Sequence, residues 1–260
     1  MTSNNIKQAV RAIMADNPGM KYTEALRTYE ASQAFDVQVS VRGRIPADAI
    51  EIGHTPDGET VNIRLSRGVF VCGTTGSGKT VAVANIAREA DSLGYEVTTL
   101  CQVHPGEIDM YVGKNLPSID PASNLSEIAS TLEDYTRDEG KKKRLLIVEE
   151  INHLVFDNDF DTERETNARR RIGVLLSFLA ESCPDTAVIM TSQRDDHRFR
   201  SQTHSLRNRI AFGRMPYGDL PVAMMPESLR VDSGDPKGTA ILASPDGTTK
   251  VRIKAPVTLR

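Results

Sequence analysis

Apolar and polar positions divide most of the chain into alternating strand-like and helix-like segments. The strand-like runs are short, apolar and rich in β-branched residues, and they lie at 69–72, 96–103, 145–148 and 187–190. The helix-like segments repeat apolar residues every three to four positions, and they lie at 79–93, 125–138 and 172–182. Strands that alternate with helices predict an α/β fold, with a mostly parallel central sheet covered on both faces.

Two turn sequences predict β-hairpins beside this region. Residues 50–66 contain the turn sequence Pro56-Asp57-Gly58, alternate after it, and lead into the strand at 69–72. Residues 239–242 and 250–253 flank Pro245-Asp246-Gly247 and predict a terminal hairpin. One further strand is expected at 210–212. Residues 157–171 are charged and lack apolar periodicity, which predicts an exposed loop or the start of a helix.

The first part of the chain predicts a separate helical segment at residues 1–35. Its apolar residues have helical spacing, and Asn17-Pro18-Gly19 interrupts them. Residues 36–49 follow as a linker with a short strand, and residues 50–260 form the main domain. Basic and acidic residues nearly balance in 1–35, which favours a helical hairpin docked on the main domain or on a neighbouring subunit. A small adaptor or nucleic-acid module is the alternative.

A glycine-rich motif lies between the strand at 69–72 and the helix at 79–93. It fits the pattern G-x-x-x-x-G-K-[ST] in full, with a strand before it and a helix after it, the setting in which this pattern forms a phosphate-binding loop. Backbone N–H groups of such a loop surround the phosphates of a nucleotide. The predicted nucleotide-binding residues are Gly73, Thr74, Thr75, Gly76, Ser77, Gly78, Lys79 and Thr80. We expect ATP and Mg²⁺ as the cofactors.

Polar residues follow the next two buried strands, where they can complete a hydrolysis site. Glu149 and Glu150 come directly after the strand at 145–148, and Gln193 follows the strand at 187–190. We expect Thr80 and Glu149 to hold Mg²⁺ and Lys79 to contact the phosphates. Glu150 is the expected general base, and Gln193 is expected to contact the γ-phosphate or the attacking water.

Composition limits the classes of partner and compartment. The net charge is −3, so contact with nucleic acid would need a local basic patch. Cys72, Cys101 and Cys183 are widely spaced and fit no metal-ligand pattern, which favours buried thiols in a reducing compartment. No apolar run is long enough to span a bilayer and no signal peptide is recognisable. We therefore expect a cytoplasmic protein without a membrane segment.

Several motifs together resemble the motor domain of the FtsK/SpoIIIE DNA translocases, within the HerA/FtsK superfamily. The resemblance covers residues 50–260 and rests on Gly73–Thr80, Ile147–Ile151, Thr191–Arg194, Arg209–Phe212 and Gly238–Ala240. It implies a RecA-like P-loop NTPase fold, a homo-oligomeric ring that is usually hexameric, and ATP hydrolysis stimulated by double-stranded DNA. A plasmid, phage or mobile element is a possible context.

The sequence departs from that family at several positions. Glu149 stands where the family has Asp, and His104-Pro105-Gly106 replaces an Asp-Pro-Lys motif. The arginine that usually precedes the sensor glutamine is absent, with Glu181-Ser182 in its place. Other arginines could supply a finger to the ATP of a neighbouring subunit, and the candidates are Arg169, Arg170, Arg171 and Arg209.

Basic residues gather after Gln193, and this stretch is the best local candidate for DNA contact. The candidates are Arg194, Arg198, Arg200 and Arg207. Arginine binds phosphate oxygens in a bidentate manner that carries no sequence information. A subunit interface explains the same residues equally well, because arginines also complete ATP sites between subunits.

Three functions remain open at this stage. The first is an ATP-driven motor that moves double-stranded DNA. The second is a secretion-type ATPase of the same superfamily, which would move protein. The third is an ATP-dependent switch or assembly factor with low turnover, which the departures at Glu149 and at the missing arginine favour.

Overall fold

The computed structural model describes two thirds of the chain in detail. The described residues are 14, 21–22, 47–100, 107–112, 118–119, 125–137, 142–156, 161–183, 185–193, 200–213, 231–232 and 234–255. The helices expected within residues 1–35 lie outside them, apart from single positions, and so does the linker with a short strand expected at 36–49, apart from residues 47–49. The chain divides into two compact units, residues 1–44 with 246–248 and residues 45–245 with 249–260. The architecture below is that of the second unit and the strands that belong to its sheet.

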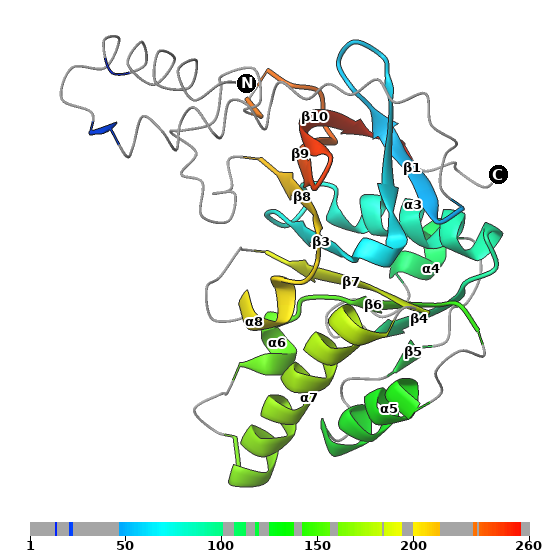
Figure 1. The fold of residues 1–260 in the computed structure, drawn as a ribbon, viewed down its shortest axis with the longest axis vertical. Coiled ribbons are helices and arrows are strands. Elements are labelled where there is room, and N and C mark those ends of the chain that lie inside the picture. The colour runs from blue at the N-terminus through cyan, green and yellow to red at the C-terminus, as the bar shows by residue number, and fades with distance from the viewer. Residues whose placement is uncertain are drawn as a thin grey trace. The chain divides into compact units, whose positions relative to one another are not determined.

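A single ten-stranded sheet organises the described residues (Figure 1). Its strands are β1 (Ala49–His54), β2 (Thr60–Arg64), β3 (Val69–Cys72), β4 (Glu96–Leu100), β5 (Ser118–Ile119), β6 (Arg144–Val148), β7 (Thr186–Ser192), β8 (Asn208–Phe212), β9 (Thr239–Ser244) and β10 (Gly247–Ile253). Their order across the sheet is β2-β1-β10-β9-β8-β3-β7-β6-β4-β5. The expected strands and both expected hairpins are therefore confirmed, with the part of 96–103 beyond Leu100 outside the described residues.

The strands β8, β3, β7, β6, β4 and β5 run parallel to one another. In this half of the sheet β7 lies between β3 and β6, although β6 precedes β7 in the chain. All residues of β3 and β7, and nearly all of β6, are buried, which explains their continuous apolar sequences. The arrangement brings the carboxyl ends of β3, β7 and β6 side by side, where a ligand of an open α/β sheet binds.

The remaining strands extend the sheet in an antiparallel manner. β9 pairs with β8, and β1 pairs with both β2 and β10. The β1–β2 register shifts between Glu51 and Gly53. Gly53 is required here, because a Cβ at this position would lie only 2.1 Å from the carbonyl oxygen of Arg252 in β10. The first hairpin of the domain thus joins the sheet through a strand from the other end of the domain.

Helices cover the two faces of the sheet and form two apolar cores. One core lies under α3 (Lys79–Ser92) and α4 (Glu107–Val112), and it also includes inward residues of β1 and β2. The other lies under α5 (Leu125–Arg137), α6 (Asn152–Val155) and α7 (Glu163–Ser182), with α8 (Arg200–Thr203) packed on α7. Figure 1 shows the two sets on opposite sides of the sheet. The α/β fold with helices on both faces is confirmed, as is the RecA-like P-loop architecture.

Helix α7 begins nine residues before the start expected from apolar periodicity. Its first residue is Glu163, whereas the sequence predicted a helix from Ile172. The Thr162 side chain accepts a hydrogen bond from the backbone N–H of Glu165, and the Glu165 carboxylate accepts one from the backbone N–H of Thr162. This capping box starts a helix in a charged stretch. Residues 157–171 were expected to form an exposed loop or the start of a helix, and 163–171 are the start of α7, whereas residues 157–160 lie outside the described ones.

Short elements that the sequence pattern did not predict are α4, β5, α6, α8 and the 3₁₀ turn at Leu65–Arg67. Within the described part of the chain, no helix has both the length and the apolar character needed to cross a membrane.

Candidate active site

The phosphate-binding loop lies at the carboxyl edge of the parallel strands, between β3 and α3. It starts at Gly73, whose N–H donates to the backbone oxygen of Ser192 at the end of β7 at 3.2 Å. It ends at Gly78, the N-cap of α3. The N-terminus of this 14-residue helix therefore points its free N–H groups toward the loop, which favours an anion. The strand–loop–helix setting expected from the sequence is present.

Two glycines of the loop have no room for a side chain. A Cβ on Gly73 would lie 2.7 Å from Ser77 Oγ and 2.8 Å from Phe212 Cβ. Gly78 has a φ of 115°, and a Cβ there would approach the Phe212 ring at 3.2 Å. Phe212, at the end of β8, thus packs under the loop and fixes its path. This role could not be predicted from the sequence, where Phe212 is recognisable only as a residue at a strand end.

Lys79 contacts both the loop and the acidic strand end. Its Nζ donates to the backbone oxygens of Gly73 at 2.7 Å and of Thr74 at 3.3 Å. The same Nζ lies 3.8 Å from Oε1 of Glu150, and both side chains are about nine-tenths buried. A buried ion pair of this kind needs its further hydrogen bonds, because each charge has lost most of its water. The structure thus brings together two of the three residues predicted to be catalytic.

Glu149 and Glu150 follow β6 as predicted, and both are buried, each 8% exposed. The N–H of Glu149 donates to the oxygen of Leu100, which extends the pairing with β4. Glu150 instead turns out of the strand direction, with a φ of 51°. Its Oε2 accepts a hydrogen bond from the backbone N–H of Gln193 at 3.1 Å. Gln193 therefore meets Glu150 through its backbone, while its side chain is exposed.

The residues of the loop fit a bound phosphate chain with Mg²⁺. Ser77 Oγ is buried and has no hydrogen-bond partner among the described residues, so the loop contains a polar atom without a partner. The Thr80 hydroxyl in the first turn of α3 and the Glu149 carboxylate after β6 are hard oxygen donors, which Mg²⁺ prefers. No group of three or more His, Cys, Asp or Glu residues in the described segments could hold a metal alone.

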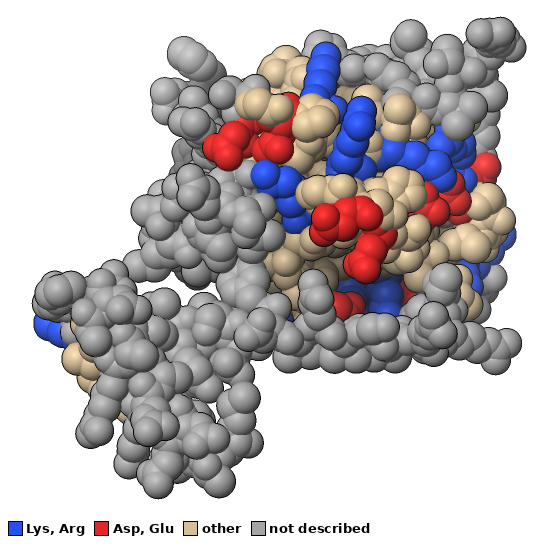
Figure 2. All heavy atoms as spheres, turned by 90° about the horizontal axis from the view of Figure 1, so that it is seen from above, with Lys and Arg blue, Asp and Glu red and all other residues tan. Residues whose placement is uncertain are grey.

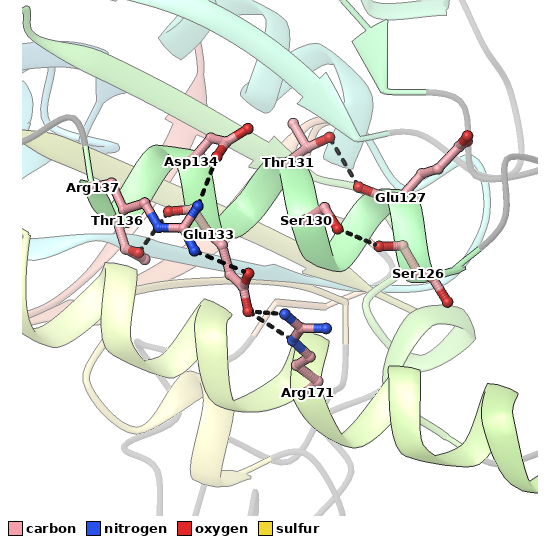
Figure 3. Close-up of polar contacts among 9 residues, drawn as sticks. All are labelled: Ser126, Glu127, Ser130, Thr131, Glu133, Asp134, Thr136, Arg137 and Arg171. Carbon is pink, nitrogen blue, oxygen red and sulfur yellow. Dashed lines mark hydrogen bonds and ion pairs between the residues drawn. The ribbon is translucent and has the colours of Figure 1, made fainter.

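Three of the four arginine-finger candidates have contacts within their own chain. Arg169 is buried and donates through Nε to Oδ2 of Asp161 at 2.7 Å. Arg171 pairs with Glu133, and Figure 3 shows this contact joining α7 to α5. Arg209 lies over the Phe70 ring, with its Cζ 5.3 Å from the ring centroid. Arg170 is exposed on α7, and its side chain forms no hydrogen bond or ion pair with the described residues.

The predicted DNA contacts fall largely outside the described residues. Arg194 and Arg198 lie there entirely, and of Arg200 only the backbone, in α8, is described. Arg207 is exposed just before β8. On the described part of the face in Figure 2, basic and acidic side chains are interspersed. A DNA surface therefore stays a prediction.

Thr191 is a residue whose contribution the sequence reasoning missed. It was noted only as part of a motif, yet its hydroxyl oxygen accepts a hydrogen bond from the backbone N–H of Glu150 at 3.0 Å. A threonine near the end of a buried apolar strand is the signal that could have drawn attention to it.

A phosphate-binding loop beside a buried glutamate at the carboxyl edge of a RecA-like sheet defines a P-loop nucleotide-binding protein. Residues 69–213, more than half of the chain, match the model of the ATPase family associated with various cellular activities (AAA). The chain belongs to this family. No curated protein sequence matches it significantly.

Solved structures with a similar fold include a conjugation coupling protein and two ATPases, one of them a type VII secretion ATPase. The conjugation coupling protein TcpA of pCW3, in its monomer form with ATPγS, has 16% identity and a TM-score of 0.65 over 82% of this chain and 67% of TcpA. ATPases 2 and 3 of EssC from Geobacillus thermodenitrificans have 11% identity and a TM-score of 0.56, over 83% and 46%. The cytoplasmic domain of the type VII secretion ATPase EccC from Thermomonospora curvata has 12% identity and a TM-score of 0.57, over 83% and 30%.

These identities establish a likeness of fold alone, and the shared fold is that of P-loop ATPases. The P-loop ATPase fold that the sequence resemblance implied is thereby confirmed. The chain spans less than half the length of the EssC and EccC structures that it matches.

Proposed function

We propose that this protein is an ATP-hydrolysing motor that moves double-stranded DNA as a homo-oligomeric ring. The observation that supports hydrolysis most directly is the contact between Lys79 and Glu150, 3.8 Å apart at the carboxyl edge of the sheet. A cation for the phosphates and a carboxylate for the water lie next to one another on rigid elements.

Each residue has a separate role in this proposal. The loop N–H groups and Lys79 bind the phosphates, and Thr80 with Glu149 holds Mg²⁺, which neutralises charge on the phosphate oxygens when bound. Glu150 accepts a proton from the attacking water. The Gln193 side chain is exposed at the end of β7 and contacts the γ-phosphate or the attacking water. Its position then depends on whether ATP has been hydrolysed, and the residues that follow it in the chain move with it.

The choice of DNA rests on the motifs and on the fold shared with the coupling protein TcpA. The arginines between 194 and 207 would contact backbone phosphates without regard to base sequence. Binding through such contacts weakens steeply with added salt. Self-association is part of the proposal, because a finger from a neighbouring subunit would complete the charge stabilisation at each ATP.

The test is ATP turnover with and without double-stranded DNA, beside a measurement of molecular mass with and without ATP. We expect turnover that DNA stimulates, and a larger assembly with ATP. Lys79→Ala should abolish turnover by removing ATP affinity, whereas Glu150→Gln should abolish turnover and keep ATP bound. Turnover that no form of DNA changes would contradict the DNA motor and leave the ATPase intact.

A second candidate is a motor that moves protein. The fold shared with the type VII secretion ATPase EccC favours it. Stimulation by a polypeptide partner in place of DNA would identify this function. A protein that stays monomeric with ATP and hydrolyses none would instead be the ATP-dependent switch that the departures at Glu149 and Glu181 favour.

A further inference from the structure

The backbone of Glu150 adopts a conformation that its side chain does not favour. With a φ of 51°, Glu150 is the one non-glycine residue in the described segments that has a positive φ. The Cβ of an L-residue crowds the following carbonyl oxygen in this left-handed region, so such a residue stays there only when its surroundings stabilise it. The strained residue is also the proposed general base. We therefore looked for the contacts that stabilise its conformation.

Thr191 on the neighbouring strand β7 provides two of these contacts. Its Oγ1 accepts a hydrogen bond from the N–H of Glu150 at 3.0 Å, and its backbone oxygen accepts one from the N–H of Ile151 at 2.9 Å. The first contact is buried and Thr191 itself is 4% exposed. The hydroxyl thus satisfies a backbone donor that a β-ladder would otherwise satisfy, at the point where the chain leaves β6.

The same strand end also binds the carboxylate of Glu150. The N–H of Gln193 donates to Oε2, while Oε1 faces Lys79. Ser192 lies between Thr191 and Gln193 in the chain, and its backbone oxygen accepts a hydrogen bond from the N–H of Gly73 in the phosphate-binding loop. Residues 191–193 therefore hold three groups in position relative to one another: the backbone of Glu150, its carboxylate, and the first residue of the loop.

We propose that the Thr191 hydroxyl is a positioning group that sets the direction of the Glu150 carboxylate by stabilising its left-handed backbone. The inference rests on the proposed ATP hydrolysis and deepens it. Without the hydroxyl, the N–H of Glu150 is buried without an acceptor, and rotation of its peptide becomes the way to satisfy it. That rotation would move the carboxylate away from its place between Gln193 and Lys79. ATP binding would persist, because Thr191 contacts no residue of the loop through its hydroxyl in the described structure.

The test compares Thr191→Val with Thr191→Ser. Valine keeps the shape and the strand preference of threonine and removes the acceptor, whereas serine keeps the acceptor and removes a methyl group. Thr186→Val is the matched control, since Thr186 is a buried threonine at the other end of the same strand. For each protein, kcat, KM for ATP, affinity for a non-hydrolysable ATP analogue and melting temperature are measured.

We expect kcat of Thr191→Val to fall about 10- to 100-fold, as small misplacements of catalytic groups do. KM and analogue affinity should stay near the wild-type values. The kcat of Thr191→Ser should be much closer to the wild-type value than that of Thr191→Val, and Thr186→Val should turn over ATP like the wild type. A merely structural role for Thr191 predicts a different pattern, in which kcat follows melting temperature in all three variants.

Failure of this inference can be distinguished from failure of the proposed function. If Thr191→Val turns over ATP as fast as the wild type, the positioning role is wrong and the proposed ATP hydrolysis still holds. A loss in Thr191→Ser as large as the loss in Thr191→Val would also overturn the positioning role. A wild-type protein that binds ATP and never hydrolyses it would overturn the proposed function, and the positioning role with it.

Discussion

The side chain of Lys79 contacts acceptors within its own chain, and bound phosphates would have to replace some of them. Its ammonium now contacts two loop carbonyls, those of Gly73 and Thr74, and the carboxylate of Glu150. In its proposed role it contacts phosphate oxygens. Arriving phosphates would therefore replace the carbonyl oxygens as acceptors for a charge that is already positioned and largely free of water. These contacts hold the Lys79 ammonium in a defined position beside the loop, which favours phosphate binding at low cost in ordering.

The close packing around Gly73 in the phosphate-binding loop can be tested by substitution. In Gly73→Ala, the new Cβ would overlap Ser77 Oγ at 2.7 Å and Phe212 Cβ at 2.8 Å. The loop must shift to relieve the overlap, and its N–H groups would then turn away from the phosphates. We expect ATP-analogue affinity to fall by at least about 10-fold, the equivalent of about 1.4 kcal/mol, measured by titration calorimetry.

Gly234→Ala is the control for the loop variant. A Cβ at Gly234 meets no atom within 4 Å, and its φ is not in the left-handed region. Its analogue affinity should match the wild type. Equal affinities for Gly73→Ala and Gly234→Ala would contradict the close-packed loop.

Among the elements, α7 shows most clearly what the sequence could and could not predict. Its second half was predicted from the apolar residues Ile172, Leu176 and Leu179, which face the core. Its first half has few apolar residues, and it is stabilised by capping and by the buried pair of Arg169 with Asp161. Periodicity detects a helix through its buried apolar face, so it could not detect this part. The sequence Thr162-Glu163-Arg164-Glu165 did contain a capping-box signature.

The site was predictable to a similar degree. The loop, Glu149, Glu150 and Gln193 follow from motifs and from strand ends, because parallel strands place their carboxyl ends at one edge. The strand order, with β7 between β3 and β6, is a long-range property that local patterns do not contain. It is this order that brings Thr191 beside Glu150. The left-handed conformation of Glu150 was equally hidden, since nothing in its own residue type favours it.

The capping box of α7 predicts a loss of stability with a defined pH dependence. Thr162→Ala removes both the acceptor for the Glu165 N–H and a donor to its carboxylate. We expect the free energy of unfolding at pH 7 to fall by about 1 kcal/mol, measured by urea denaturation. Hydrogen bonds from the Thr162 side chain, and then from its backbone, lower the pKa of Glu165 from the ordinary 4.5.

The sign of the pH effect follows from that direction. A carboxyl group with a pKa lowered by folding stabilises the folded state above its unfolded pKa, and this contribution disappears as the pH falls through the folded value. The difference between wild type and Thr162→Ala should therefore be largest at neutral pH and shrink below pH 4.5. A difference that grows on acidification would show that Glu165 is not the partner of Thr162.

For the proposed ring, the candidate for an arginine that completes the ATP site of a neighbouring subunit can be ranked by exposure and surroundings. Arg170 is exposed on α7, one turn before Val174, which is 68% exposed, and two turns before Phe178. An arginine beside exposed apolar side chains suits a surface between subunits. We therefore rank Arg170 first among the finger candidates.

Mixing two inactive variants tests this ranking. Lys79→Ala lacks a working loop and keeps Arg170, whereas Arg170→Ala keeps its loop. We expect each to be inactive alone and their mixture to recover part of the turnover, because a neighbour supplies the missing arginine. Arg164→Ala, which removes another exposed arginine of α7, should stay active by itself. A fully active Arg170→Ala would remove Arg170 from the candidates.

The pairing of β1 with β10 leaves β1 without its partner strand during much of translation. β1 ends at His54 and its partner strand begins at Gly247, so the ribosome finishes the first strand long before the second exists. At about 5 to 20 residues per second, that interval lasts on the order of 10 to 40 seconds. During this time β1 of the nascent β1–β2 hairpin has an open edge, and an unpaired strand edge can join another chain. The polar side chains of β2 and the charged Glu51 of β1 limit that risk while translation continues.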